Sequence, residues 1–262
     1  MSVWFVGVFG IYVRGLRMTW GIGGKHLFCA RAMSDVQITI PLEYGGFKYL
    51  NILQKVHLIT PKITVLFAGS VRLALAIIED LKRNYAPKVK SAWYAEPSHV
   101  ANDLRRHINR SDEINRTPMD GQVQFLVFVA PNGTHKSFGM FKMVSPGYSI
   151  STTKEGTPFE IFELGSGSVL DDYRSIVSRH SEGVYFFDDD EGGKPNAVIP
   201  VGKVALEFAY QEALQYQNAG ISKAMHITLV THKKAILKML PESPNLAFPQ
   251  VADNWGDLCQ LA

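Results

Sequence analysis

Four residues in the first part of the chain have the types and the order needed for nucleophilic catalysis: Thr19, Asp35, Lys55 and Gly69. A threonine at the amino terminus of a chain is an unusual nucleophile. Its own α-amine, with a pKa of about 7.7–8.0, can take the hydroxyl proton at neutral pH. Thr19 would become such a residue if translation began at Met18 and the initiator methionine were then removed.

The other three residues offer the groups that this nucleophile needs. Lys55 stands at the start of an apolar strand, and its ammonium would lower the pKa of the α-amine and stabilise developing negative charge. Asp35 follows Thr19 by sixteen positions, across an expected hairpin, and would hold Lys55 in place. Gly69 lies between an expected strand and an expected helix, where its backbone N–H could donate to an oxyanion.

The segment before Thr19 begins with thirteen residues that carry no charge and are strongly apolar as a group. A spanning helix needs about 20 apolar residues, and this run stops at Arg14. A secretory signal places its positive charges before the apolar stretch, whereas Arg14 and Arg17 follow it. We therefore interpret residues 1–18 as a leader or as the product of a mis-assigned start codon. A true start at Met1 would make Ser2 a rival nucleophile, but no carboxylate and lysine follow it at comparable spacing.

Composition and charge narrow the class of protein further. The 262 residues are 46% hydrophobic and 19% charged, which supports a sizeable core and excludes wholesale disorder. The net charge of +3 is too small and too scattered to indicate a nucleic-acid partner. Only two cysteines occur, Cys29 and Cys259, which excludes a disulfide scaffold and favours a reducing, cytoplasmic location.

No motif for a metal or a cofactor stands out. The eight histidines are dispersed, and neither a His-Glu-x-x-His motif nor a P-loop occurs. The Gly165-Ser166-Gly167-Ser168 turn lacks the third glycine of a dinucleotide fingerprint. The acidic stretch at 188–191 is typical of a solvated surface loop, and His57 and His226 are typical of structural histidines in strands. We predict no metal and no cofactor.

Hydrophobic periodicity predicts strands, two helices, strands, two helices and a last strand. The expected strands are 19–23 and 25–30 around a Gly23-Gly24 turn, 36–40, 55–59, 63–67, 122–130, 136–143, 158–164 and 225–231. Four helices are expected. The first begins after Ser70 as its N-cap, and the second spans 97–109 and is followed by a loop at 110–121. The third follows Ser168, and the fourth begins at Pro200.

The grouping of strands into antiparallel hairpins favours an α+β domain over a doubly wound parallel sheet. We predict a four-layer αββα sandwich, in which two antiparallel sheets pack face to face and a helix pair flanks each outer side. The domain is expected to span residues 19–240, and residues 241–262 are expected to form an irregular C-terminal tail.

This order of residues resembles the proteasome β-subunit family, including its bacterial relatives, within the N-terminal nucleophile hydrolases. The resemblance spans roughly residues 19–231. It rests on Thr19 with Gly21, Ser34-Asp35, Lys55-Val56-x-x-Ile59, Ala68-Gly69-Ser70 before a helix, and Leu164-Gly165-Ser166-Gly167-Ser168 before another. The stretch from Asp35 to Lys55 is a few residues longer than is usual in the family.

The resemblance implies a role for each matching residue. Thr19 matches the nucleophile, Asp35 and Lys55 match its charged partners, and Gly69 matches the oxyanion-hole glycine. It also implies two further catalytic residues, Ser166 near the amine of the nucleophile and Ser222 as a second such serine.

The function expected from these features is a cytoplasmic threonine-type hydrolase that cleaves peptide bonds after residues 1–18 are removed. Its partners would be peptide or protein substrates and further copies of itself, in a homo-oligomer such as a ring, with no nucleic acid and no membrane. Two alternatives stay open: a non-peptide amidase on the same fold, and a catalytically silent scaffold or assembly subunit that retains residues 1–18.

Overall fold

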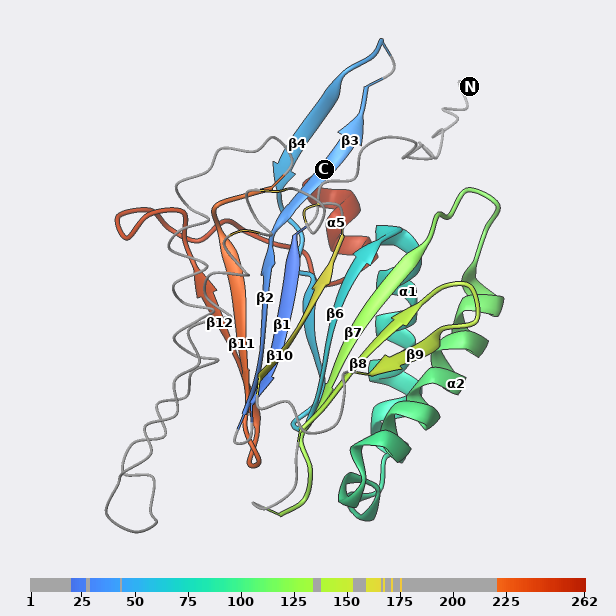
Figure 1. The fold of residues 1–262 in the computed structure, drawn as a ribbon. Coiled ribbons are helices and arrows are strands. Elements are labelled where there is room, and N and C mark those ends of the chain that lie inside the picture. Colours follow the sequence, from blue (N-terminus) through green and yellow to red (C-terminus); the bar gives the residue numbers. More distant parts are fainter. Residues whose placement is uncertain are drawn as a thin grey trace, which may run out of the picture.

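The computed structural model describes residues 20–26, 29–42, 44–133, 138–152, 159–165, 167, 171, 175 and 221–262. In this part of the chain the strands form three antiparallel sheets (Figure 1). One five-stranded sheet, the β1 sheet, has the order β10-β1-β2-β11-β12. Its strands are β1 (Gly21–His26), β2 (Ala30–Asp35), β10 (Phe159–Leu164), β11 (Met225–Val230) and β12 (Ala235–Leu240).

The second five-stranded sheet, the β6 sheet, has the order β5-β6-β7-β8-β9. Its strands are β5 (Val56–Thr60), β6 (Ile63–Gly69), β7 (Val123–Val129), β8 (Gly139–Val144) and β9 (Ser149–Thr152). Two helices, α1 (Val71–Asp80) and α2 (Pro97–Asn115), cover its outer face (Figure 1). A π-helical turn (Leu81–Tyr85) and two 3₁₀ segments (Ala86–Lys88 and Ser91–Ala95) connect them.

The third sheet is a hairpin of β3 (Gln37–Pro41) and β4 (Phe47–Asn51), which projects from the rest of the molecule (Figure 1). Gly45 and Gly46 form its turn with φ values of +88° and +87°, a backbone region that glycine enters without steric cost. The turn expected there is thus confirmed. This hairpin occupies the long stretch between Asp35 and Lys55.

The two large sheets pack face to face around a shared core. The core between them draws side chains from both: Ala30, Ala32, Leu164, Val230 and Ala235 from the β1 sheet and its turns, and Val56, Leu66, Ala68, Leu126, Phe128 and Met140 from the β6 sheet. A second core lies between the β6 sheet and the helices and includes Phe67, Leu75, Ile78, Leu104, Ile108 and Phe125. Burial of each Leu, Ile or Phe side chain contributes about 1.5–3 kcal/mol.

These contacts describe three layers, in the order helices, sheet, sheet (Figure 1). The fold is therefore a mixed α/β arrangement of antiparallel sheets. The fourth layer of the expected sandwich would be made by the helices after Ser168 and from Pro200. Both segments lie outside the described residues, as does the acidic stretch at 188–191.

The turn expected at Gly23-Gly24 is wrong. Both glycines lie inside β1, which pairs with β2 from Gly21 opposite Ser34 to Lys25 opposite Ala30. A Cβ atom on Gly23 would lie 2.3 Å from Cζ of Phe128 in the facing sheet. The two sheets therefore approach closely at Gly23, where the absence of a side chain leaves room for Phe128. In the sequence, a glycine required for close packing looks the same as a glycine required for a turn.

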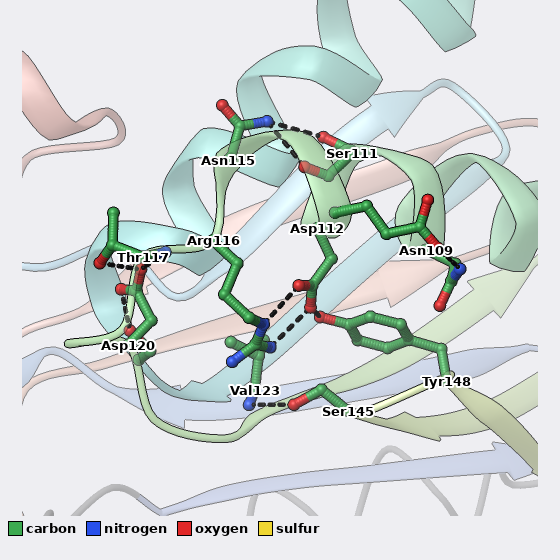
Figure 2. Close-up of polar contacts among 12 residues, drawn as sticks. Asn109, Ser111, Asp112, Asn115, Arg116, Thr117, Asp120, Val123, Ser145 and Tyr148 are labelled. Atoms are coloured by element: carbon green, nitrogen blue, oxygen red, sulfur yellow. Dashed lines mark hydrogen bonds and ion pairs between the residues drawn. The ribbon is translucent and has the colours of Figure 1, made fainter.

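The expected loop at 110–121 is also wrong over its first half, because α2 continues to Asn115. The polar residues there are paired with one another. Arg116 donates from Nε to Oδ1 of Asp112, 2.5 Å away, and from Nη2 to Oδ2, 2.6 Å away (Figure 2). Tyr148, the residue directly before β9, donates its hydroxyl hydrogen to the same carboxylate. Partnered polar groups can be buried on a helix, so polarity alone did not mark its end.

Four strands and one helix were not predicted from the sequence: β2, β4, β9, β12 and α5 (Trp255–Leu261). The strand expected at 25–30 shares only Ala30 with β2. The tail expected to be irregular contains α5, whose N-cap Asn254 accepts a hydrogen bond from the N–H of Asp257. Leu258 is buried in the core beneath the helices. Before α5, Ala252 forms a parallel bridge with Leu53, so the tail packs against the domain.

Candidate functional site

The centre of the candidate site is a buried ion pair between Asp35 and Lys55. Asp35 is the last residue of β2, and Lys55 directly precedes β5. The Nζ of Lys55 donates to Oδ1 of Asp35 at 2.7 Å, and the side chains are 2% and 0% exposed. The backbone carbonyl of Lys55 accepts from the N–H of Phe67, which ties the lysine to the strand that ends at Gly69.

The carboxylate of Asp35 is held by backbone donors as well. Its Oδ1 also accepts from the N–H of Trp20 at 3.0 Å, and its Oδ2 accepts from the N–H of Gln37 at 3.0 Å. Burial raises the pKa of the Asp35 carboxyl and lowers the pKa of the Lys55 ammonium. The attraction between the two charges and the hydrogen bonds to the carboxylate oppose these shifts. A buried pair of this kind is costly to separate.

The chain enters the β1 sheet beside this pair. Trp20 is buried, and its carbonyl accepts from the N–H of Asp35 at 3.1 Å while its own N–H donates to the carboxylate. Thr19 and Ser166, two of the residues singled out in the sequence, lie outside the described residues. Thr19 is joined to Trp20 by a peptide bond.

Ser222 is hydrogen-bonded to the backbone of Val36, the residue that follows Asp35. Its Oγ accepts from the N–H of Val36 at 3.1 Å and donates to the carbonyl of Ala224 at 2.6 Å. The serine is 4% exposed. Ser222 therefore anchors the residue after Asp35 to the segment that leads into β11.

Gly69 ends β6 in a conformation that requires glycine. Its φ is +102°, and a Cβ atom there would lie 2.1 Å from the carbonyl oxygen of Gln122. The next residue, Ser70, donates its N–H to the same carbonyl at 2.9 Å and is the N-cap of α1. The hydroxyl of Ser70 does not cap the helix but donates to Oδ1 of Asp120 at 2.9 Å. The strand-to-helix turn expected at this position is confirmed.

His226 is a neighbour of the ion pair that the sequence reasoning treated only as a structural residue. It lies in β11 opposite Ser34 of β2 and is fully buried. Burial, together with the charge of Lys55, lowers the pKa of His226 to about 4. Its ring packs edge-on against Phe248, with the ring centroids 5.0 Å apart. The pairing of β11 with β2 joins residues almost 200 positions apart, so no local pattern pointed to this contact.

His57, in β5, packs on the side of the β6 sheet that faces the helices. It stacks on Phe67 with a centroid separation of 5.9 Å, and its Nε2 pairs with the carbonyl of Gln54 at 2.8 Å. Burial lowers the pKa of His57 to about 3. Both histidines are thus neutral at physiological pH, His57 in the field of Lys82 and His226 in that of Lys55.

The described residues contain neither a cluster of metal-ligating side chains nor a membrane-spanning helix. No group of three or more His, Cys, Asp or Glu residues is placed there to hold a metal ion. None of the helices described is long and apolar enough to cross a membrane.

Solved structures similar in fold to this chain include two Anbu structures. One is Anbu (ancestral beta-subunit) from Yersinia bercovieri, with a TM-score of 0.57, 12% sequence identity, and coverage of 86% of this chain and 88% of that one. The other is a mutant of Anbu from Hyphomicrobium sp. strain MC1, with a TM-score of 0.59, 11% identity, and coverage of 87% and 88%. No family model matches the chain, and no curated protein matches it.

These findings correct the family resemblance inferred from the sequence. The assignment to the proteasome β-subunit family is wrong as it was made, because the similar structures are Anbu proteins, which bear on that family only distantly. The likeness found is to Anbu structures, at 11–12% identity. Similarity at that level extends to the fold alone, because one fold can carry unrelated activities. The chain therefore shares the fold of the Anbu structures over most of its length.

Proposed function

We propose that the chain is a threonine-type hydrolase that acts on peptide bonds through Thr19 as its amino-terminal residue. The observation that carries the proposal is the buried Lys55–Asp35 pair, whose carboxylate also binds the N–H of Trp20. Trp20 is the residue that directly follows Thr19 in the sequence. In this proposal residues 1–18 are removed, and 19–240 form the catalytic domain.

In the proposed mechanism, the hydroxyl of Thr19 attacks the substrate carbonyl while its α-amine takes the proton, directly or through water. The Lys55 ammonium lowers the pKa of that amine, and Asp35 orients Lys55. The N–H of Gly69 stabilises the oxyanion, and Ser166 supports the amine. The protonated α-amine of Thr19 then gives its proton to the leaving amine of the substrate, and water hydrolyses the acyl-enzyme formed at Thr19. Ser222 contributes by holding Val36, beside Asp35.

The proposal also covers the oligomeric state, the remaining layer of the fold and the location of the enzyme. The similar protein from Yersinia bercovieri is an ancestral beta-subunit, and a subunit belongs to an assembly, which supports self-association of this chain into a homo-oligomer. The three described layers support a four-layer αββα sandwich in which the helices after Ser168 and from Pro200 form the last layer. We place the enzyme in the cytoplasm, since two cysteines in 262 residues suit a reducing compartment.

The test begins with the intact mass of the purified chain, which shows whether its first residue is Met1 or Thr19. A chain that starts at Thr19 should be labelled by a peptide epoxyketone, an electrophile directed at amino-terminal threonine. Thr19→Ala should abolish both labelling and peptide hydrolysis, while Thr19→Ser should retain part of each. Hydrolysis that survives in Thr19→Ala would refute the mechanism. A panel of peptide and non-peptide amides then identifies the substrate class.

A further inference from the structure

The turn at Gly69 and Ser70 is attached to a carboxylate that the mechanism above does not use. Asp120 lies in the connection between α2 and β7, and its side chain is 4% exposed. Its Oδ1 accepts from the hydroxyl of Ser70 at 2.9 Å and from Nε of Arg72 at 3.2 Å. Its Oδ2 accepts from the N–H and the hydroxyl of Thr117, at 2.9 Å and 2.8 Å (Figure 2). Nη2 of Arg72 also donates to Oδ2.

These bonds connect three elements at one point. Arg72 lies in the first turn of α1 and donates from Nη2 to the carbonyl of Asn115, the last residue of α2, at 2.7 Å. Two residues after Asp120, the carbonyl of Gln122 accepts from the N–H of Ser70 at 2.9 Å. Residues 120–122 therefore hold Ser70 by its side chain and by its backbone.

This double attachment restricts the peptide unit of Gly69. A left-handed glycine has no side chain to fix its backbone, so the residues around it must do so. The carbonyl of Gln122 closes the space on one side of Gly69, where a Cβ atom would lie 2.1 Å from it. Asp120 holds the adjacent residue, Ser70, through the hydroxyl. The direction of the Gly69 N–H is thus determined by residues of the α2–β7 connection.

The charge of Asp120 is suited to this position only because Arg72 is paired with it. Burial alone would raise the pKa of the Asp120 carboxyl, but the hydrogen bonds from Arg72, Thr117 and Ser70 together outweigh it and lower the pKa to about 2, so the group is ionised throughout the neutral range. A carboxylate beside the turn would oppose an oxyanion there. The guanidinium of Arg72 balances that charge, so the carboxylate can hold Ser70 without adding net negative charge beside the turn.

We propose that Asp120 is a positioning residue, which with Arg72 fixes the Gly69–Ser70 turn and so sets the direction of the Gly69 N–H. The inference rests on the proposed function, because that N–H matters for catalysis only if it stabilises the oxyanion. In this role Asp120 acts on the reaction indirectly, through its bonds to Ser70 and Arg72 at the start of α1.

The experiment compares Asp120→Asn and Ser70→Ala with Asp112→Asn in the chain that starts at Thr19. Asp112 is the matched control, because it too is a buried carboxylate paired with an arginine near the end of α2 (Figure 2). It binds Arg116 and Tyr148, and within the described residues its side chain forms no hydrogen bond with Gly69 or Ser70. Its link to Gly121 in the α2–β7 connection is indirect, through Nη1 of Arg116, which donates to the carbonyl of Gly121 at 3.2 Å. Each variant is assayed for kcat, KM and thermal midpoint, and the exchange rates of the Gly69 and Ser70 amides are measured by NMR.

Loss of one oxyanion donor lowers kcat by roughly 10²–10³-fold, so a donor that is present but misdirected should cost roughly tenfold. We expect that loss in Asp120→Asn and Ser70→Ala, with KM within about twofold, since ground-state binding is unchanged. The double variant should lose little more than either single variant, because both act through one bond. Asp112→Asn should lower the thermal midpoint while kcat stays within about twofold.

Equal kcat for Asp120→Asn and Asp112→Asn would overturn the inference. Failure of the proposed function has a different result: peptide hydrolysis would then persist in Thr19→Ala. The positioning inference in that case is judged on amide exchange alone. Faster exchange at Gly69 and Ser70 in Asp120→Asn, but not in Asp112→Asn, would support it, and unchanged exchange would overturn it.

Discussion

The backbone of Trp20 is hydrogen-bonded to Asp35 in both directions. The N–H of Trp20 donates to Oδ1 of Asp35 at 3.0 Å, and the N–H of Asp35 donates to the carbonyl of Trp20 at 3.1 Å. The same Oδ1 accepts from Nζ of Lys55 at 2.7 Å. One carboxylate thus links the first described residue of the domain to a buried lysine.

The first prediction concerns the cost of breaking this ion pair. Lys55→Met leaves the Asp35 carboxylate buried without its counter-charge, and should lower the free energy of unfolding by about 3–5 kcal/mol. Lys82→Met is the control, because Lys82 and Asp253 form a partly exposed pair at 3.3 Å whose loss should cost at most about 1 kcal/mol. Urea denaturation measures both values, and equal losses would contradict a buried, charged Lys55–Asp35 pair.

The second prediction concerns pH and His226. The ring has an ordinary pKa of 6.5 when exposed in the unfolded chain, and burial lowers the folded-state value to about 4. Between these values the unfolded chain binds more protons, so its free energy falls as the pH falls. The stabilisation associated with neutral His226 is complete above about pH 6.5 and is lost as the pH decreases toward 4, by roughly 2–4 kcal/mol in total.

Urea denaturation between pH 7.5 and 4.5 tests this prediction with His226→Phe. The variant should lose less stability than the parent over the acidic part of that range, because the phenyl ring takes up no proton in either state. His99→Phe, at an exposed position, provides the comparison. A parallel pH dependence for the parent and His226→Phe would show that His226 does not have the lowered pKa.

The third prediction separates two costs at glycines with positive φ. Gly69→Ala places a methyl group 2.1 Å from the carbonyl of Gln122, whereas Gly133→Ala, at a φ of +95°, meets nothing within 4 Å. Gly133→Ala should cost about 1–2 kcal/mol of backbone strain alone. Gly69→Ala should cost clearly more in thermal or chemical denaturation, because backbone atoms must move to relieve the contact. A smaller loss at Gly69 than at Gly133 would argue against the close approach.

The fourth prediction concerns the approach of the two sheets at Gly23. A Cβ atom there would lie 2.3 Å from Phe128 and 2.5 Å from Cδ2 of Leu126, so Gly23→Ala should destabilise by about 1–3 kcal/mol through overpacking. The contacts are the ends of side chains that can be shortened. Phe128→Leu in the same chain should therefore recover part of the loss, which a double-mutant cycle would detect as coupling. Strict additivity would mean that the two residues do not meet.

Local patterns in the sequence were sufficient for most of the elements around the site. The alternation and apolar runs that predict β3, β5, β6, β7, β10 and β11 depend on neighbouring residues, as does the helix that begins after Ser70. Patterns failed where a residue type has two uses. The glycines of β1 resemble a turn, and the charged end of α2 resembles a loop, because a sequence does not show what Gly23 faces or that Asp112 is paired with Tyr148.

By itself, the sequence determined the antiparallel hairpins, the strand-to-helix turn at Gly69 and the types of residue available for chemistry, because these follow from local periodicity and side-chain chemistry. Only the tertiary structure decided that Lys55 is buried against Asp35, that β11 places His226 beside them, and that Asp120 holds Ser70. Those contacts join residues from separate elements. Their geometry depends on how the sheets and helices pack, and packing is a property of the whole core.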